Sequence, residues 1–163
     1  MFRFIRIGCT KPVGVEETLR LNRILDKYRP RIYPPRSEAK FYWNDLSSAE
    51  LWAENCLLLG GKAKVWLVEV EGNCVECDFF LVEVLAEDKS LPEKEVEKWA
   101  ITYWGSCRKP EKLKEIGNTE VLCWNVKEKR TLLAEIDNLE ELQTTFNKIK
   151  KKLLQHKTLK CLP

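Results

Sequence analysis

The chain has 163 residues, of which 44% are hydrophobic and 33% are charged, and its formal net charge is +3. This composition is typical of a folded globular protein and excludes a disordered or low-complexity chain. No apolar run approaches the ~20 residues that a membrane-spanning helix needs, so no membrane association is expected. The length predicts a single domain that spans residues 1–163.

In the N-terminal half, strands and helices are predicted to alternate. Residues 2–8 alternate apolar and polar side chains, a pattern typical of a strand. Residues 13–28 repeat apolar side chains at helical spacing. Residues 39–44 predict a short aromatic strand, and residues 45–61 predict a helix with a Ser-x-x-Glu capping box that starts at Ser47.

The C-terminal half predicts two hairpins and two helices. Residues 62–88 are expected to form a hairpin around a Gly-Asn turn, and residues 119–136 a second hairpin. A helix capped by Ser90 lies between them. A basic helix at about 138–157 closes the chain, and its lysines are interpreted as a solvated face in preference to a phosphate-binding stripe. Because regular βαβ units are absent, the predicted class is α+β with a largely antiparallel or split sheet.

The seven cysteines suggest a reduced, cytoplasmic protein with mostly free thiols, because no secretory signal is recognised at the start of the sequence. Cys74 and Cys77 have the Cys-x-x-Cys spacing of half a zinc site, for which Cys107, Cys123 and Cys161 are the available partners. The preferred interpretation is that Cys74 and Cys77 are two ordinary thiols beside a turn, and no metal site is assigned. A disulfide between Cys74 and Cys77 stays open as a third possibility.

Familiar catalytic motifs, such as a phosphate-binding glycine loop or a G-x-S-x-G turn, are absent from the sequence. The one histidine, His156, belongs to the basic helix, and nothing near it resembles a catalytic site. The remaining candidates for functional residues are therefore arginines, aromatic side chains and a carboxylate at the start of an apolar strand. The candidates are Arg6, Arg36, Tyr42, Trp43, Asn44 and Glu120.

Three stretches resemble, in the same order, the ADP-ribosyltransferase family and its uncharacterised bacterial and phage members. "FIRIGCT" is similar to the family's first strand, and "PPRSEAKFYWNDLSSAELWA" with "KVWLVEVEG" is similar to its second block. "NTEVLCW" resembles the third block, in which a Glu stands directly before Val-Leu at the start of a strand. The resemblance spans residues 2–126 and implies a split antiparallel sheet with flanking helices.

The resemblance also implies a function, namely transfer of ADP-ribose from NAD to a macromolecular acceptor, either protein or nucleic acid. Glu120 would then be the catalytic carboxylate, and Arg6 would hold the NAD phosphates. This is chemically sensible, because cleavage of the bond between nicotinamide and ribose develops positive charge that a fixed carboxylate stabilises. Arginine also provides the fork-shaped cation that a pyrophosphate needs.

Four further residues are assigned to NAD on the same grounds. Tyr42, Trp43 and Asn44 would line the nicotinamide side, where an aromatic ring offers a flat apolar wall. Arg36 would help to position the cofactor. The alternative hypothesis is a non-catalytic module on an α+β domain that binds protein or nucleic acid, which the aromatic residues and the basic helix favour.

Overall fold

The computed structural model describes the chain through Lys160, and its side chains through Leu154. Within this part of the chain it contains α-helices and an antiparallel sheet, which confirms the predicted mixture of the two. The elements in chain order are β1 (Phe2–Cys9), α1 (Val15–Lys27), the 3₁₀ turn η1 (Arg36–Glu38), β2 (Lys40–Tyr42), α2 (Leu46–Leu58), β3 (Ala63–Asp78), α3 (Phe79–Glu87), α4 (Glu93–Gly105), β4 (Thr119–Ile136) and α5 (Leu139–Lys160).

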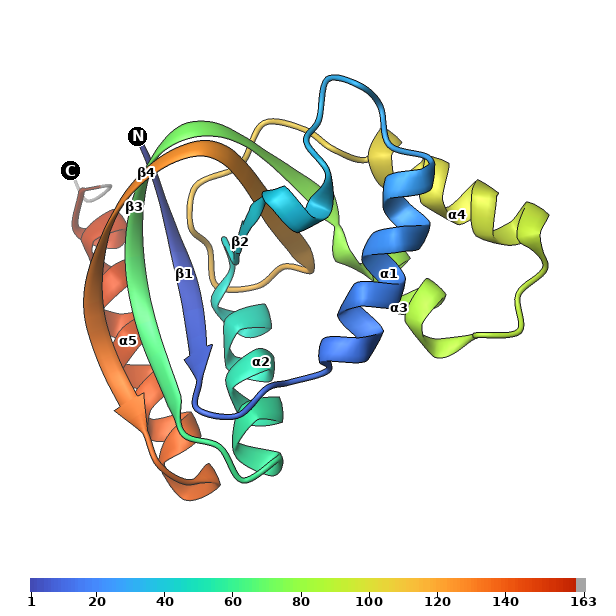
Figure 1. Ribbon diagram of the computed structural model, residues 1–163. Coiled ribbons are helices and arrows are strands. Elements are labelled where there is room, and N and C mark those ends of the chain that lie inside the picture. The colour runs from blue at the N-terminus through green and yellow to red at the C-terminus, as the bar shows by residue number, and fades with distance from the viewer. Residues whose placement is uncertain (161–163) are drawn as a thin grey trace.

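The four strands form one antiparallel sheet in the order β1-β3-β4-β2, and this sheet curls strongly (Figure 1). The curl brings the two outer strands into contact. The N–H of Ile5 donates to the carbonyl of Trp43 at 2.7 Å, and the N–H of Trp43 donates back to Ile5 at 2.8 Å. The end of β2 therefore lies against the middle of β1, although Ile5 and Trp43 are 38 positions apart in sequence (43 − 5 = 38).

The two predicted hairpins are wrong, because each one is a single long strand that bends without reversing. In β3 the bend falls at Gly72, where the pairing register with β4 shifts. Gly72 has a φ of 154°, and Asn125 on the facing strand has a φ of 54°. A Cβ at position 72 would lie 2.9 Å from the carbonyl oxygen of Asn125, so only glycine allows the strands this close an approach.

Three local predictions also need correction. Residues 79–87, predicted as part of a strand, form helix α3, whose first turn is capped by the Asp78 carboxylate accepting from the N–H of Phe80 at 3.3 Å. Helix α2 is capped by Asp45, two residues before the expected Ser47. The N-cap of α4 is Pro92, which makes no side-chain cap bond.

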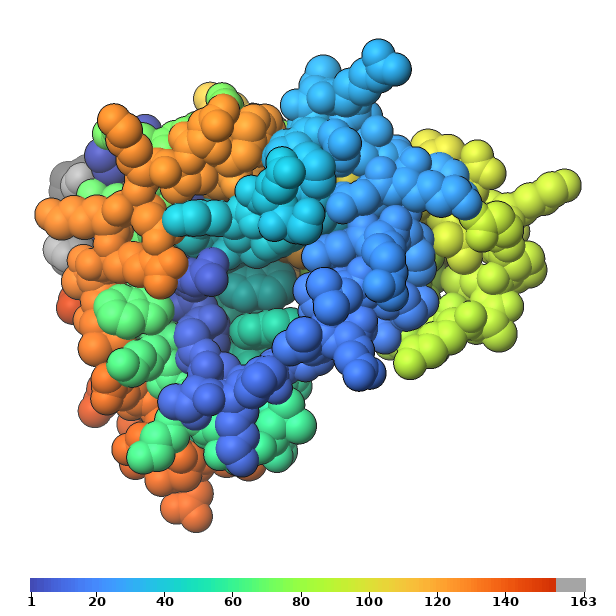
Figure 2. Space-filling model, viewed as in Figure 1, coloured from blue at the N-terminus to red at the C-terminus, as the bar shows by residue number. Residues whose placement is uncertain are grey.

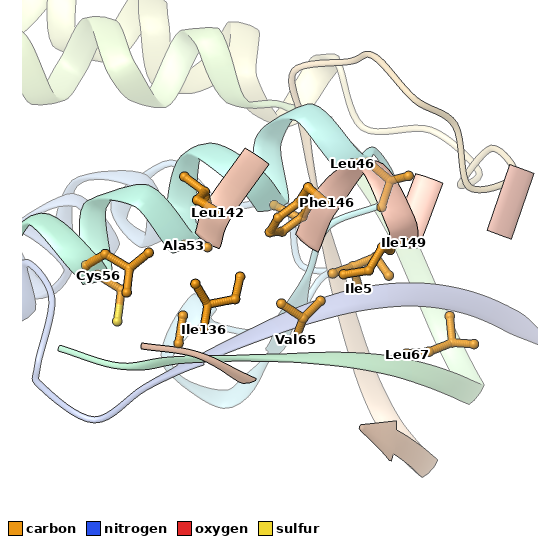
Figure 3. Packing of buried hydrophobic residues seen from close by; sticks show 13 residues of the cluster. Ile5, Leu46, Ala53, Cys56, Val65, Leu67, Ile136, Leu142, Phe146 and Ile149 are labelled. Carbon is orange, nitrogen blue, oxygen red and sulfur yellow. The ribbon is translucent and has the colours of Figure 1, made fainter. Parts of the chain in front are cut away.

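The outer face of the sheet is covered by α2 and α5, which pack side by side against β1, β3 and β4 (Figures 1 and 3). Both helices direct apolar side chains onto the sheet, as the apolar seam of the C-terminal helix predicts. The buried side chains labelled in Figure 3 include Ile5, Leu46, Val65, Ile136, Phe146 and Ile149.

Two further apolar clusters complete the core. One joins α1, α3 and α4 to the far end of β3 and β4, and it includes Leu25, Leu85 and Tyr103. The other fills the concave side of the curled sheet, where Phe4 and Tyr42 stack with ring centroids 5.7 Å apart. The candidate site lies where these clusters meet the end of β2.

Six of the seven cysteines form disulfides, so the expectation of mostly free thiols is wrong for them. Cys74 and Cys77 do not pair with each other; each bonds a cysteine from another segment. The pairs are Cys9–Cys56, Cys74–Cys123 and Cys77–Cys107. The seventh, Cys161, and the side chain of His156 lie outside the described part of the structure. None of the described helices is long and apolar enough to cross a bilayer.

Candidate functional site

A cavity of about 460 Å³ opens between β1, β2, α1, α2 and α3. Figure 2 shows its mouth as a hollow between β1 and α1, with atoms of the β2–α2 segment behind it. The volume lies within the range of small-molecule pockets, roughly 300–1,000 Å³. The predicted site residues that line it are Arg6, Arg36, Tyr42, Trp43 and Glu120. The structure thus brings five of the six predicted residues to one cavity.

Arg6 reaches the cavity because it lies on β1 one residue after the bridge to β2. Its Nη1 donates to the carbonyl oxygen of Phe41 at 3.2 Å, and its guanidinium carbon lies 6.0 Å from the centre of the Tyr42 ring. Arg6 has no ion-pair partner among the described residues. Its remaining N–H groups are therefore available to an anionic group in the cavity. Arg3, on the opposite face of the strand, is exposed.

Glu120 and Arg36 form a buried ion pair at the inner end of the cavity. Nη1 of Arg36 donates to Oε1 of Glu120 at 2.5 Å, and the two side chains are 5% and 6% exposed. The Tyr103 hydroxyl donates to the same carboxylate oxygen at 2.5 Å. Arg36 is held from its other side by Asn22, whose Oδ1 accepts from Nε at 2.9 Å. Such a pair is stable only because further hydrogen bonds satisfy both groups.

Electrostatics at this pair follow from burial and proximity. Burial is the largest single influence and lowers the pKa of Arg36, but Glu120, Tyr103 and Asp26 together outweigh it, so the pKa of the guanidinium is raised above its ordinary value. Burial raises the pKa of the Tyr103 hydroxyl well above its ordinary value, and the Glu120 charge raises it further. Arg36 is therefore a permanent cation and Tyr103 a permanent hydrogen-bond donor at neutral pH.

Aromatic side chains form the rest of the cavity wall. Trp43 lies 5.2 Å from Phe79 in an edge-to-face arrangement and 5.9 Å from Trp52, measured between ring centroids. The ring of Phe41 lies 4.7 Å from the guanidinium carbon of Arg36. The arrangement offers flat apolar surfaces on one side of the cavity and a cationic group, Arg6, on another.

Two predicted cofactor residues depart from expectation: Tyr42 belongs to the cavity lining but is almost fully buried, and Asn44 is not part of the lining. The Tyr42 ring is 1% exposed and points into the concave side of the sheet, where its hydroxyl donates to Glu128. Burial raises the pKa of the Tyr42 hydroxyl above its ordinary value, and the hydrogen bond to Glu128 raises it further. Asn44 does not line the cavity; its Nδ2 donates to the buried Glu76 at 3.1 Å and its Oδ1 accepts from Thr119 at 2.8 Å.

Sequence reasoning missed several residues of the cavity. Tyr103 falls on an apolar stripe of the helix in residues 93–105, which is typical of a core side chain, and its contact with Glu120 is a long-range one. Phe79 and Glu83 fall in a predicted strand, in which they share one face but Val82 and Ala86 lie on the other. The helical spacing of residues 79, 82, 83 and 86, all of which line the cavity, is the signal that could have found them.

Among the described residues, no cluster of three or more His, Cys, Asp or Glu side chains could hold a metal ion. The four candidate zinc ligands that the structure describes are all used in disulfides. No family model, curated protein or solved structure matches this chain. The cavity itself is therefore the feature of the molecule that indicates a function.

Proposed function

We propose that the cavity binds NAD and that the protein transfers ADP-ribose to a macromolecular acceptor, on a fold related to that of the ADP-ribosyltransferases. One observation carries the proposal: Arg6, Trp43 and Glu120, which belong to three separate segments of the sequence, line the same cavity. Each of these segments belongs to one of the three stretches that resemble the family. A chance resemblance gives no reason for them to meet.

The cavity suits the parts of NAD. The free N–H groups of Arg6 match the pyrophosphate, which needs a fork-shaped cation. Trp43 and Phe79 provide flat apolar walls for the nicotinamide ring. The ribose attached to that ring would then lie toward the inner end of the cavity, where Glu120 is placed.

In the proposed reaction the bond between the nicotinamide nitrogen and the ribose carbon breaks, and its electron pair leaves with nicotinamide. A nucleophilic atom of the acceptor bonds to the same carbon and releases its proton to solvent. The Glu120 carboxylate stabilises the positive charge that develops on the ribose between the two events. Because Arg36 holds this carboxylate in the ligand-free protein, binding must weaken the ion pair, and the phosphates of NAD offer Arg36 an alternative partner.

The second candidate is a binding module that holds a ligand in this cavity without cleaving it. The same ion pair favours it, because a carboxylate neutralised by Arg36 and 6% exposed stabilises a nearby cation less than a free one would. In this case NAD, or another ligand with a flat ring and an anionic group, would bind and remain intact. The macromolecular partner would be bound elsewhere on the surface.

The test is incubation of the protein with NAD labelled in the adenylate half, in the presence of a cell extract. Wild type is expected to label macromolecules, and Glu120→Gln is expected to reduce the rate by roughly a hundredfold, the size of effect seen when one stabilising group is removed. Glu135→Gln is the matched control, because it changes an exposed carboxylate on the same strand. Melting temperatures of the three proteins show whether each one folds.

The outcome separates the two candidates. Equal labelling by wild type and Glu120→Gln contradicts the catalytic proposal. No labelling, together with a rise in melting temperature on addition of NAD, supports the binding module. No labelling and no rise in melting temperature rejects both candidates for NAD.

We also propose a setting in which thiols are oxidised, in place of the reduced one that the sequence predicts. Three disulfides persist only where thiols are oxidised, as in secreted proteins, or inside cells of hyperthermophiles, which are rich in disulfides. Either setting is compatible with the proposed chemistry, since no cysteine lines the cavity among the described residues.

A further inference from the structure

Among the residues that the structure describes, Glu83 is the one carboxylate of the cavity without a protein partner. It lies on α3 four residues after Phe79, so the two side chains occupy the same face of the helix, about one turn apart. Val82 and Ala86 lie on that face too, and all four residues line the cavity. Glu83 is half-buried and makes no hydrogen bond or ion pair with the described part of the chain.

The other two carboxylates of the cavity are already neutralised. Glu17 accepts from Arg20 at 2.5 Å and lies 3.6 Å from Lys89. Glu120 is paired with Arg36. Glu83 and Arg6 are thus the two unpaired charges on the wall, and they form no ion pair with each other.

The wall beside Glu83 consists of aromatic faces and edges. Trp43, Trp52 and Phe79 form a continuous group with centroid distances of 5.2 to 5.9 Å. An aromatic wall attracts a cation through the negative faces of its rings, and a nearby carboxylate adds direct charge attraction. A neutral flat ring would gain the apolar contact alone.

From this arrangement we infer that the aromatic side of the cavity is a site for a flat ring that carries a positive charge, and that Glu83 selects the charged ring over a neutral one. The inference rests on the proposed function only in that it takes the cavity to be a ligand site. It requires neither that NAD be the ligand nor that any bond be broken. The oxidised nicotinamide ring of NAD is one member of this class of ligand.

The experiment measures binding of two small probes by calorimetry or by tryptophan fluorescence. 1-Methylnicotinamide carries a permanent positive charge on its ring, whereas nicotinamide is a neutral ring of nearly the same shape. Wild type is expected to bind the charged probe roughly three- to thirtyfold more tightly, the range that a cation–aromatic contact with a partial ionic contribution implies. In Glu83→Gln this preference is expected to fall by about threefold or more, with little change in binding of the neutral probe.

The matched control is Glu87→Gln, which removes the same charge from an exposed position on the same helix, outside the cavity. It is expected to leave the preference unchanged. Equal preferences in wild type and Glu83→Gln would overturn the inference, and so would an equal loss in both variants, which would indicate a long-range charge effect. Failure of wild type to bind the charged probe would overturn it as well. None of these results depends on whether NAD is cleaved, so the inference and the proposed function can fail separately.

Discussion

The position and contacts of Glu120 fit both a functional carboxylate and a purely structural ion-pair partner. Its place at the head of an apolar strand suggested a functional carboxylate, and the structure does place it on a cavity wall. The same carboxylate also has the ion-pair partner that a purely structural residue would have, Arg36, and it accepts from Tyr103 as well. The Arg36–Glu120 ion pair would therefore affect both the stability of the protein and the proposed catalysis. Mutation of either residue tests its effect on stability directly.

Replacement of Arg36 by Met is expected to lower the free energy of unfolding by roughly 3–5 kcal/mol, because Glu120 is left buried without its cation. The measurement is urea unfolding followed by circular dichroism. Arg31→Met is the control, since Arg31 is exposed and lies in the same connecting segment, and its loss is expected to stay within about 0.5 kcal/mol. A similar small loss for Arg36→Met would show that Glu120 does not depend on this partner.

The sequence singled out those cavity residues whose charge or aromatic character was unusual for a strand or a strand end. Arg6, Trp43 and Glu120 are of this kind. Glu83 and Tyr103 were missed because a carboxylate on a helix is ordinarily solvated and a tyrosine on an apolar stripe is ordinarily core. Only the tertiary structure brings the Tyr103 hydroxyl to Glu120 and places Glu83 on the cavity wall.

Elements were predicted well where the pattern was local. Strand β1, helix α1 and helix α5 follow from their apolar periodicity. The two long strands could not be predicted, because Gly-Asn is typical of a tight turn and also of a bulge. Whether Gly72-Asn73 forms a turn or a bulge depends on the facing strand. Strand β4 bends at Asn125 opposite Gly72, and the two strands remain paired on both sides of the bend.

Gly72→Ala is expected to destabilise the protein by roughly 1–3 kcal/mol, because the new methyl group would meet the Asn125 carbonyl at 2.9 Å in a backbone conformation that favours glycine. Gly105→Ala provides the contrast, since a Cβ there meets nothing within 4 Å at the end of α4. It is expected to be neutral or to stabilise by up to about 1 kcal/mol. Thermal unfolding of both variants measures the difference, and equal stabilities would contradict the role given to the bulge.

For the molecule as a whole, the disulfides were beyond the reach of sequence reasoning. The bonded cysteines are 47, 49 and 30 residues apart, and only the Cys74–Cys123 pair follows from strand register. Cys9–Cys56 ties the end of β1 to α2, and Cys77–Cys107 ties β3 to the segment after α4. The first of these bonds thus attaches α2, which forms part of the cavity wall, covalently to the sheet.

Non-reducing denaturation followed by thiol titration is expected to detect at most one free thiol among the seven cysteines, since six are paired (7 − 6 = 1). The double change Cys9→Ser and Cys56→Ser is expected to lower the free energy of unfolding by roughly 2–4 kcal/mol, because it frees a long closed loop in the unfolded chain. Seven reactive thiols in freshly purified protein, or no loss of stability in the double variant, would contradict the pairing.

The contact between Ile5 and Trp43 has a consequence for how this protein meets others. An open sheet offers the unpaired backbone of its outermost strands to any extended peptide, which is a common route to fibres and to strand-exchange dimers. Here the backbone groups of Ile5 on β1 and of Trp43 at the end of β2 bond to each other and are not free for a peptide. Recruitment of a partner by backbone addition is disfavoured there, and recognition must be achieved with side chains.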